Sequence, residues 1–279
     1  MSTIDQAVAD PPPSGPNGDG ALLELRSVTK TFGPVRALTD VDLVIPAGEV
    51  TALVGDNGAG KSSLIKTVSG LWGPDAGQIL WQGRKVELHG PRDAEGLGIT
   101  TIYQDLALCD NLDIVQNMFL GHEPVHWGVL DEGTMESAAR ATLKELNVTT
   151  VRSIRQPVAS LSGGQRQSVA VAKAVMSKAQ LVIMDEPTAA LGVAQTTMVL
   201  NLIKTLSGRG TAVLLISHNL NDVFEVADRI AVLYLGRLAV QGKAAGFDRQ
   251  NLVEYMTTGT ATRAYDGSGT ATTETKGER

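Results

Sequence analysis

A glycine-rich stretch, GDNGAGKSS at Gly55–Ser63, constrains the fold of this chain more than any other feature. It directly follows the apolar run EVTALVG, which is typical of a strand buried inside a parallel sheet. It leads into the helical pattern KSSLIKTVSG, with Gly70 at its end. The pattern GxxxxGK[ST] between a strand and a helix predicts a loop whose backbone N–H groups wrap phosphates. A chance glycine turn is the alternative, and both the spacing and the context speak against it.

Other apolar runs predict the rest of the sheet. ITTIYQ at 99–104, QLVIMDE at 180–186 and TAVLLISH at 211–218 are typical of buried parallel strands. At the N-terminal side, LLELRSVTKTF and LTDVDLVI alternate between apolar and polar residues, as strands with one buried face do. GQILWQGRKVEL reads as a hairpin, and RIAVLYLGRLAVQG as a second one with Gly236 at its turn.

Helical patterns fill the space between these strands. A helix is expected from LSGGQ to about Ser177, and another over TTMVLNLIKTLS. The stretch from about 105 to 165 also turns helical, and one predicted helix places four apolar residues near one face: Met135, Ala139, Leu143 and Leu146. We therefore predict an α/β fold with a mainly parallel sheet, an N-terminal antiparallel β part and an inserted helical subdomain. The expected domain covers 21–258, between a disordered arm at 1–20 and a disordered tail at 259–279.

Polar side chains follow several of the predicted strands. LVIMDE ends in Asp185 and Glu186, and a phosphate loop that binds a Mg-nucleotide needs an acid at the end of a neighbouring strand. Asp185 suits the Mg²⁺ shell, whereas Glu186 is expected to point the opposite way because side chains alternate along a strand. Glu186 is the natural base for an attacking water. His218 and Gln104 also end strands, where ligands bind in such sheets.

Two features remain open from the residues alone. Phe32 could stack on an adenine face or pack in the core, and the sequence does not separate the two. LSGGQRQ at Leu161–Gln167 is a second glycine-rich helix start that could bind phosphate, a hundred residues after the first. Ser162 is its expected N-cap.

Composition excludes several functions. The 279 residues are 43% hydrophobic with a net charge of −6, which is enough for one core and offers no basic stripe for nucleic acid. No apolar run approaches the roughly 20 residues that span a bilayer, so a membrane role would come through a partner. The start of the chain lacks the features of a secretory signal. One cysteine, Cys109, excludes an internal disulfide and fits a reducing compartment.

Taken together, the motifs resemble those of an ABC-transporter ATP-binding subunit, over about residues 22–245. LSGGQ at the start of a helix, followed some 20 residues later by two strand-end acids, is a specific combination. The resemblance implies ATP and Mg²⁺ as cofactors. It makes Phe32 the adenine-stacking aromatic, Gln104 the Q-loop glutamine and His218 the switch histidine. It assigns the remaining roles as follows: nucleotide binding by Gly55, Asp56, Asn57, Gly58, Ala59, Gly60, Lys61, Ser62, Ser63, Ser162, Gly163, Gly164 and Gln165, metal binding by Ser62, Gln104 and Asp185, and catalysis by Glu186 and His218.

The resemblance extends to bacterial importers of ribose, xylose, fructose and similar monosaccharides. It is carried by GDNGAGKSSLIK, IYQDLALCDNLDIVQNMFLGHEP and MDEPTAALG. Many of those proteins carry two ATPase halves, whereas this chain has one half with every catalytic element, as the shorter fructose-type members do. The D-loop departs from most ABC ATPases, with Gly192 in place of Asp, a change that sugar importers often show.

This resemblance implies an ATP-hydrolysing motor on the cytoplasmic side of the bacterial inner membrane. Its expected partners are membrane permease subunits, a second ATPase subunit in a homodimer and, indirectly, a sugar-binding protein. The alternatives are an importer of another substrate and a non-transport ABC ATPase; the latter usually carries tandem domains or a coiled coil and a basic surface. A P-loop kinase or GTPase is a third, but the NKxD pattern is absent and LSGGQ has no task there.

Overall fold

The structure is a computed structural model that describes residues 20–262 apart from 147, 149 and 190. The expected arm at 1–20 and tail at 259–279 lie outside the described residues, except for Gly20 and residues 259–262. Within the described part of the chain, no helix is both long and apolar enough to cross a membrane.

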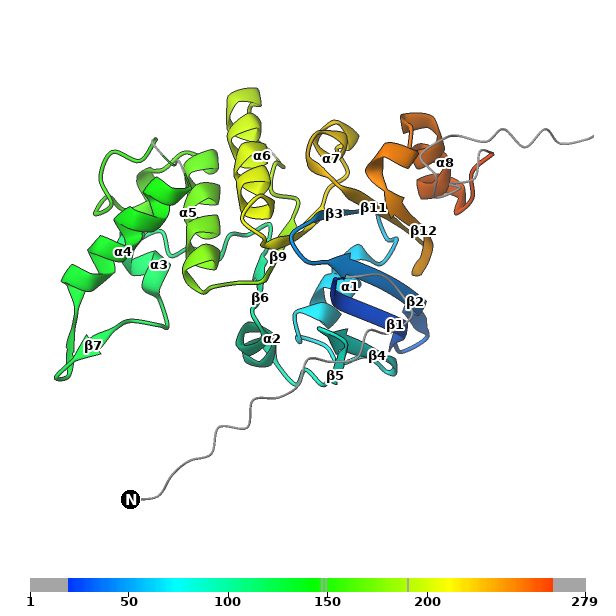
Figure 1. Ribbon diagram of the computed structural model, residues 1–279, viewed down its shortest axis with the longest axis horizontal. Helices are drawn as coiled ribbons and strands as arrows, with labels where there is room; N and C mark the ends of the chain where they lie inside the picture. The colour runs from blue at the N-terminus through cyan, green and yellow to red at the C-terminus, as the bar shows by residue number, and fades with distance from the viewer. Residues whose placement is uncertain (1–19, 147, 149, 190, 263–279) are drawn as a thin grey trace, which may run out of the picture.

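A six-stranded sheet forms the centre of the molecule (Figure 1). Five of its strands run parallel, and the edge strand β12 pairs antiparallel with β11. The strand order is β12-β11-β3-β10-β9-β6, and the bounds are β3 Val50–Val54, β6 Ile99–Ile102, β9 Leu181–Asp185, β10 Ala212–Ile216, β11 Arg229–Tyr234 and β12 Arg237–Lys243.

The central strands are apolar on both faces because both faces are covered. In β9, Leu181 and Ile183 pack in the cluster that contains helix α1 (Lys61–Val68). Val182 and Met184 face the other way, into the cluster of helices α5 (Gly163–Met176) and α6 (Val193–Ser207). Continuous apolar runs are therefore the signature of this sheet, as its sequence predicts.

A second, antiparallel sheet lies beside α1, in the order β2-β1-β4-β5. Helix α1 is buried between the two sheets, since its core residues pack with strands of both. This arrangement confirms the predicted N-terminal antiparallel part and the hairpin over GQILWQGRKVEL. The bounds are β1 Ala21–Phe32, β2 Val35–Pro46, β4 Ala76–Trp81 and β5 Arg84–Val86.

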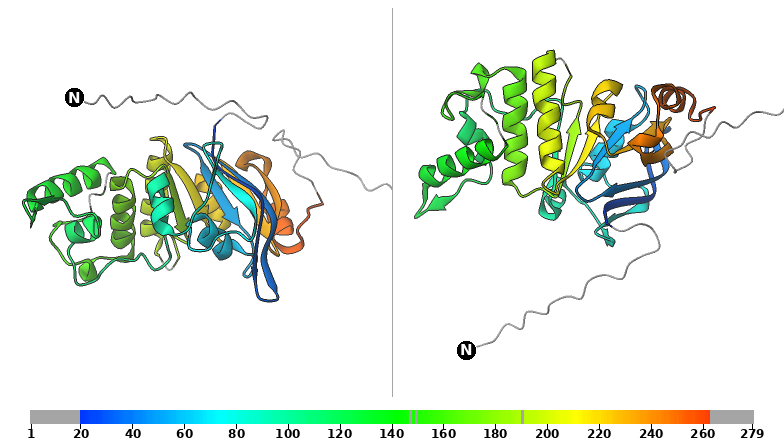
Figure 2. Two further views of the ribbon diagram at one scale, coloured as in Figure 1. Left: turned by 90° about the horizontal axis from the view of Figure 1, so that it is seen from below. Right: turned by 45° about the horizontal axis from the view of Figure 1, so that its top comes forward.

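A helical subdomain is inserted between β6 and β9, and it projects away from the two sheets (Figures 1 and 2). It consists of α3 (Ile114–Phe119), α4 (Glu132–Glu145), a 3₁₀ turn at Val158–Ser160 and α5. The four residues expected on one face of α4 are all buried against α3 and α5, which confirms that helix: Met135, Ala139, Leu143 and Leu146.

The stretch from 105 to 165 is nevertheless less helical than its pattern predicts. A small hairpin, β7 (Val125–His126) with β8 (Val129–Leu130), interrupts it between α3 and α4. Its turn residues Trp127 and Gly128 both have positive φ, of 51° and 79°. This is the geometry of a tight hairpin turn, which a helix cannot contain.

Three short helices were not predicted: α2 (Pro91–Leu97), α7 (Leu220–Val226) and α8 (Arg249–Thr258). Helices α7 and α8 cover the β3 and β11 end of the central sheet with an apolar cluster of their own. Each begins at a side-chain N-cap, Asn219 for α7 and Asp248 for α8. Those caps are the sequence signal that could have located both helices.

Candidate nucleotide-binding site

The glycine-rich loop connects the carboxyl end of β3 to the start of α1. Its glycines are required by space and backbone conformation. A Cβ atom on Gly55 would lie 2.3 Å from the carbonyl oxygen of Leu233, and one on Gly60 would lie 2.6 Å from that of Ala37. Gly60 has φ +105° and is the N-cap of α1, without any side-chain cap. The first amides of α1 are therefore left for a ligand.

Lys61 is the first residue of α1, and its side chain folds back over the loop. Its Nζ donates to the carbonyl oxygens of Gly55 at 2.7 Å and Asp56 at 3.0 Å. Burial lowers the pKa of Lys61, and the carboxylates of Glu186, Asp56 and Asp185 oppose that effect. The ammonium is thus held inside the loop next to the acids of β9, where a phosphate anion would replace the lost hydration.

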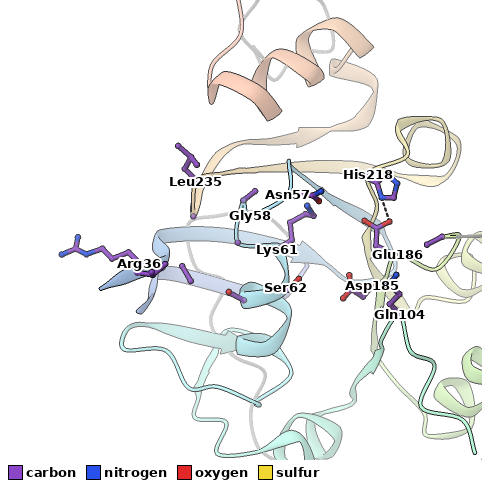
Figure 3. A pocket seen from close by; sticks show the side chains of 17 residues that line it. Arg36, Asn57, Gly58, Lys61, Ser62, Gln104, Asp185, Glu186, His218 and Leu235 are labelled. Carbon is purple, nitrogen blue, oxygen red and sulfur yellow. Dashed lines mark hydrogen bonds and ion pairs between the residues drawn. The ribbon is translucent and has the colours of Figure 1, made fainter. Parts of the chain in front are cut away.

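The loop forms one wall of a cavity of about 680 Å³ (Figure 3). Gln104, Asp185, Glu186 and His218 come from three neighbouring strand ends and line the same cavity. This confirms that the sequence-predicted polar residues meet at the carboxyl edge of the sheet. The loop itself contributes Asn57, Gly58, Ala59, Gly60, Lys61, Ser62 and Ser63 to the lining.

Asp185 and Glu186 occupy the floor of the cavity next to each other. Burial raises the pKa of Asp185, the nearby Glu186 carboxylate adds to the rise, and Lys61 and Lys66 oppose it. A bound cation would offset the cost of ionising this buried carboxylate. Ser62, Gln104 and Asp185 offer a hydroxyl, an amide oxygen and a carboxylate to the same cavity, which are hard oxygen donors that fit Mg²⁺. Among the described residues no three His, Cys, Asp or Glu side chains gather as a metal cluster. Phosphate oxygens and waters would complete the shell of a Mg²⁺ ion held by Ser62, Gln104 and Asp185.

The expected orientation of Glu186 is wrong. Strand β9 ends at Asp185, and Glu186 has a left-handed backbone with φ +52°. Its amide donates to the carbonyl oxygen of Ile216 at 3.0 Å, so the turn is fixed by β10. The alternation rule applies only within a strand, and the left-handed residue brings both carboxylates into one cavity.

Glu186 and His218 form a hydrogen-bonded pair. Nδ1 of His218 lies 2.7 Å from Oε2 of Glu186, as the dashed line in Figure 3 marks. The Glu186 side chain is mostly buried, whereas the imidazole is 69% exposed at the cavity mouth. The contact fixes the position of the Glu186 carboxylate at the cavity.

The opposite end of the cavity was not predicted. It is lined by Val35, Arg36 and Ala37, at the start of β2, and by Leu235 and Gly236 in the β11–β12 turn. Only the tertiary fold brings the start of β2 and the β11–β12 turn together, so no local sequence pattern predicted that these residues line the cavity. Their mixed apolar and basic character suits the base and ribose end of a nucleotide.

Phe32 does not line the cavity. It ends β1 with 38% of its surface exposed, which excludes the core-packing interpretation. Its ring contacts Trp72 edge-on with centroids 4.5 Å apart, and Nζ of Lys30 lies 5.7 Å from its centroid. The adenine-stacking role of Phe32 stays a prediction.

The LSGGQ segment also lies away from the cavity: none of Ser162, Gly163, Gly164 and Gln165 is among the described residues that line it. Strands β6 and β9 lie between α5 and α1 in Figure 1. Ser162 caps α5 as expected, and a Cβ on Gly164 would lie 2.9 Å from Cε of Met198 in α6. Gly164 thus permits close helix packing, while Ser162 and Gly163 stay exposed.

A parallel sheet with a strand–GxxxxGK[ST]–helix unit, strand-end acids and antiparallel and helical additions defines a P-loop nucleoside triphosphatase. The sequence profile of the ABC transporter family matches residues 38–189. The fructose import ATP-binding protein of Rhizobium meliloti is 46% identical over 243 residues, which cover 85% of this chain and 94% of that protein. The xylose/arabinose import ATP-binding protein of Sulfolobus acidocaldarius is 46% identical over 236 residues, with the same coverage.

The ribose import ATP-binding protein of Rubrobacter xylanophilus is 44% identical over 235 residues, but this chain spans only 46% of its length. Among solved structures, an ATP-binding cassette of an ABC transporter in its ADP conformation aligns with a TM-score of 0.72 over 85% of this chain and 95% of the other, at 24% identity. A dimeric cassette in a post-hydrolysis state, bound to ADP and Pi, aligns with a TM-score of 0.67 over 81% and 100%, at 25% identity. The chain belongs to the ABC transporter family, as a nucleotide-binding ATPase subunit.

Proposed function

We propose that this chain is the ATP-hydrolysing motor of a bacterial importer for a monosaccharide. The observation that carries the proposal is the cavity in which Lys61, Asp185, Glu186 and His218 converge. Sequence similarity to proteins named for fructose, xylose/arabinose and ribose import supports the sugar. Because those relatives are named as ATP-binding proteins of import, membrane permease subunits are the partners of this proposal.

In this proposal the loop binds the phosphates of ATP. The α1 amides and the Lys61 ammonium contact the terminal phosphates, while Ser62, Asp185 and Gln104 hold Mg²⁺. Bound Mg²⁺ would neutralise charge on the phosphate oxygens. Glu186 accepts the proton of the water that attacks the γ-phosphorus, and ADP leaves. His218 holds the carboxylate in place through its Nδ1 contact.

The LSGGQ segment acts in this proposal on a second copy of the chain. Because it lies outside its own cavity, it would close the cavity of a partner in a head-to-tail homodimer. The dimer would sit at the cytoplasmic face of the membrane against the permease, and a sugar-binding protein outside would select the substrate. No nucleic-acid partner is proposed.

The test is reconstitution of the chain with the permease that co-purifies with it, in proteoliposomes loaded with MgATP and with the sugar-binding protein added outside. We expect uptake of labelled fructose, xylose, arabinose or ribose that depends on ATP and is lost with Glu186→Gln. Gln104→Ala should reduce uptake more than ATP binding, since Gln104 joins the cavity to the helical subdomain. ATP-driven uptake of amino acids or metal ions in place of sugars would contradict the sugar assignment.

A further inference from the structure

Behind the Glu186–His218 pair lies a buried carboxylate, Asp222 on α7. Only 5% of its surface is exposed, and it does not line the cavity. One of its oxygens, Oδ2, accepts from the hydroxyl of Thr188 at 2.6 Å. The other, Oδ1, accepts from the side-chain amide of Asn219 at 3.1 Å. A buried carboxylate with a separate donor on each oxygen fixes the positions of both donors.

The two donors belong to the two loops that carry the pair. Thr188 lies two residues after Glu186, in the turn that follows β9. Asn219 directly follows His218, in the loop after β10, and it is also the N-cap of α7, accepting from the amide of Asn221 at 3.0 Å. The two loops that carry Glu186 and His218 are therefore linked twice. Asp222 links them through Thr188 and Asn219, and the Glu186–His218 contact of 2.7 Å links them at the cavity.

The same turn reaches the LSGGQ segment of its own chain. The amide of Leu191 donates to the carbonyl oxygen of Thr188 at 3.2 Å. A Cβ atom on Gly163 would lie 2.9 Å from Cδ2 of Leu191. A shift of Thr188 would therefore displace both Glu186 and the start of α5.

We propose that Asp222 is a positioning residue for ATP hydrolysis, which sets the separation of Glu186 and His218 by holding Thr188 and Asn219 together. This rests on the proposed role of Glu186 as the base. Because Asp222 touches neither phosphate nor metal sites, its loss impairs the hydrolytic step and leaves nucleotide binding intact. An amide at 222 can keep both contacts, since its oxygen can accept from Asn219 and its NH₂ group can donate to the hydroxyl of Thr188, so the test has to remove both acceptor oxygens.

The experiment removes the carboxylate and then exchanges it with the amide. Asp222→Ala is expected to lower kcat about tenfold, with the KM for MgATP within about twofold. Asn219→Asp alone should also lower kcat, because it sets two carboxylates against each other. Adding Asp222→Asn to Asn219→Asp restores a donor–acceptor pair, because the new amide can donate to the new carboxylate and still accept from Thr188. The double variant should therefore recover most of the kcat that Asn219→Asp loses. Glu225→Gln is the matched control, an exposed acid on the same helix whose change should leave kcat unaltered.

Asn219→Asp alone provides a second readout at an exposed position, where folding is not at risk. It places a carboxylate beside that of Asp222, and the repulsion between the two like charges breaks the contact. A loss of kcat in this variant therefore reports on the contact between the two loops.

Three results would overturn the proposal: wild-type kcat in Asp222→Ala, a double variant no better than Asn219→Asp, or a rise in KM that matches the fall in kcat. Wild-type protein and the Glu186→Gln variant distinguish failure of this proposal from failure of the proposed function. If the wild-type protein does not hydrolyse ATP, or if Glu186→Gln hydrolyses it normally, the proposed function fails first. If both behave as proposed and the exchange does not rescue, only the role of Asp222 fails.

Discussion

The molecule contains two glycine-rich helix starts that are built differently. Helix α1 begins at Gly60 in a left-handed conformation, with no side-chain cap and with Lys61 beside it. Helix α5 begins at Ser162 with a capping box: Oγ of Ser162 accepts from the amide of Gln165 at 3.4 Å, and Oε1 of Gln165 accepts from the amide of Ser162 at 2.9 Å. The first start has open amides inside a cavity, whereas the second has a side-chain cap that serves the amides of Ser162 and Gln165 and does not reach those of Gly163 and Gly164.

The difference shows what each start can bind. The α1 start and its lysine can hold phosphate within a single chain. The α5 start leaves the amides of Gly163 and Gly164 for an acceptor, which in the proposed dimer comes from the partner chain. The long Ser162 Oγ–Gln165 N distance of 3.4 Å makes this cap easy to exchange.

Removing the charge at the first start should have the largest effect. Lys61→Ala is expected to weaken MgATP binding by about a hundredfold or more and to abolish hydrolysis, because the phosphates lose their only cation from the loop. Equilibrium binding of a fluorescent ATP analogue and phosphate release measure the two losses. Lys66→Ala, which removes the same charge from the opposite end of α1, should keep both activities. Near-normal hydrolysis by Lys61→Ala would show that the α1 start is not the phosphate site.

Glu186→Gln should sharpen the comparison, because it stops the reaction while the starts of α1 and α5 both contact ATP. Loss of the base lowers kcat by about 100- to 1,000-fold, since an amide cannot accept the proton of the attacking water. MgATP should remain bound through Lys61, Ser62 and Asp185, so an ATP-dependent dimer should accumulate. Gel filtration with and without ATP measures this dimer. Wild-type turnover, or a monomer in saturating ATP, would count against the account.

The smallest expected effect concerns the buried charge of Asp185 in protein without Mg²⁺ or nucleotide. The folded-state pKa of Asp185 is raised, mainly by burial, so its stabilising contribution is complete below the unfolded pKa and is lost as the pH rises through the folded one. At neutral pH the ionised carboxylate therefore destabilises the ligand-free protein. Asp185→Asn should raise the melting temperature on the order of 2 °C without Mg²⁺ or nucleotide, and the gain should shrink as the pH falls. A lower melting temperature at neutral pH would contradict this assignment.

Much of the fold could be predicted because its signals are local. The apolar runs of β3, β9 and β10, the glycine pattern before α1 and the Ser162 cap each lie within a few residues of what they specify. The same holds for the residues at the strand ends, since parallel strands share one carboxyl edge. Gln104, Asp185, Glu186 and His218 meet there for that reason.

The remainder depends on contacts between distant segments. The orientation of Glu186 follows from a hydrogen bond to Ile216 on another strand, which no pattern around residue 186 contains. Leu235 and Arg36 line the cavity because the β11–β12 turn and the start of β2 meet there. The bonds of Asp222 likewise join two loops that only the folded sheet brings together.

The central claim is that the α5 start of one chain serves the α1 start of another, and mixed dimers test it most directly. Two dead variants are mixed in equal amounts, Lys61→Ala with Ser162→Arg, and in parallel a chain carrying both changes is mixed with wild type. If LSGGQ acts on the partner, random pairing leaves roughly a quarter of the sites fully wild-type in each mixture, so both should hydrolyse ATP at about a quarter of the wild-type rate. If LSGGQ acted within its own chain, the first mixture would stay inactive and the second would reach about half the wild-type rate. That second pattern would contradict the account.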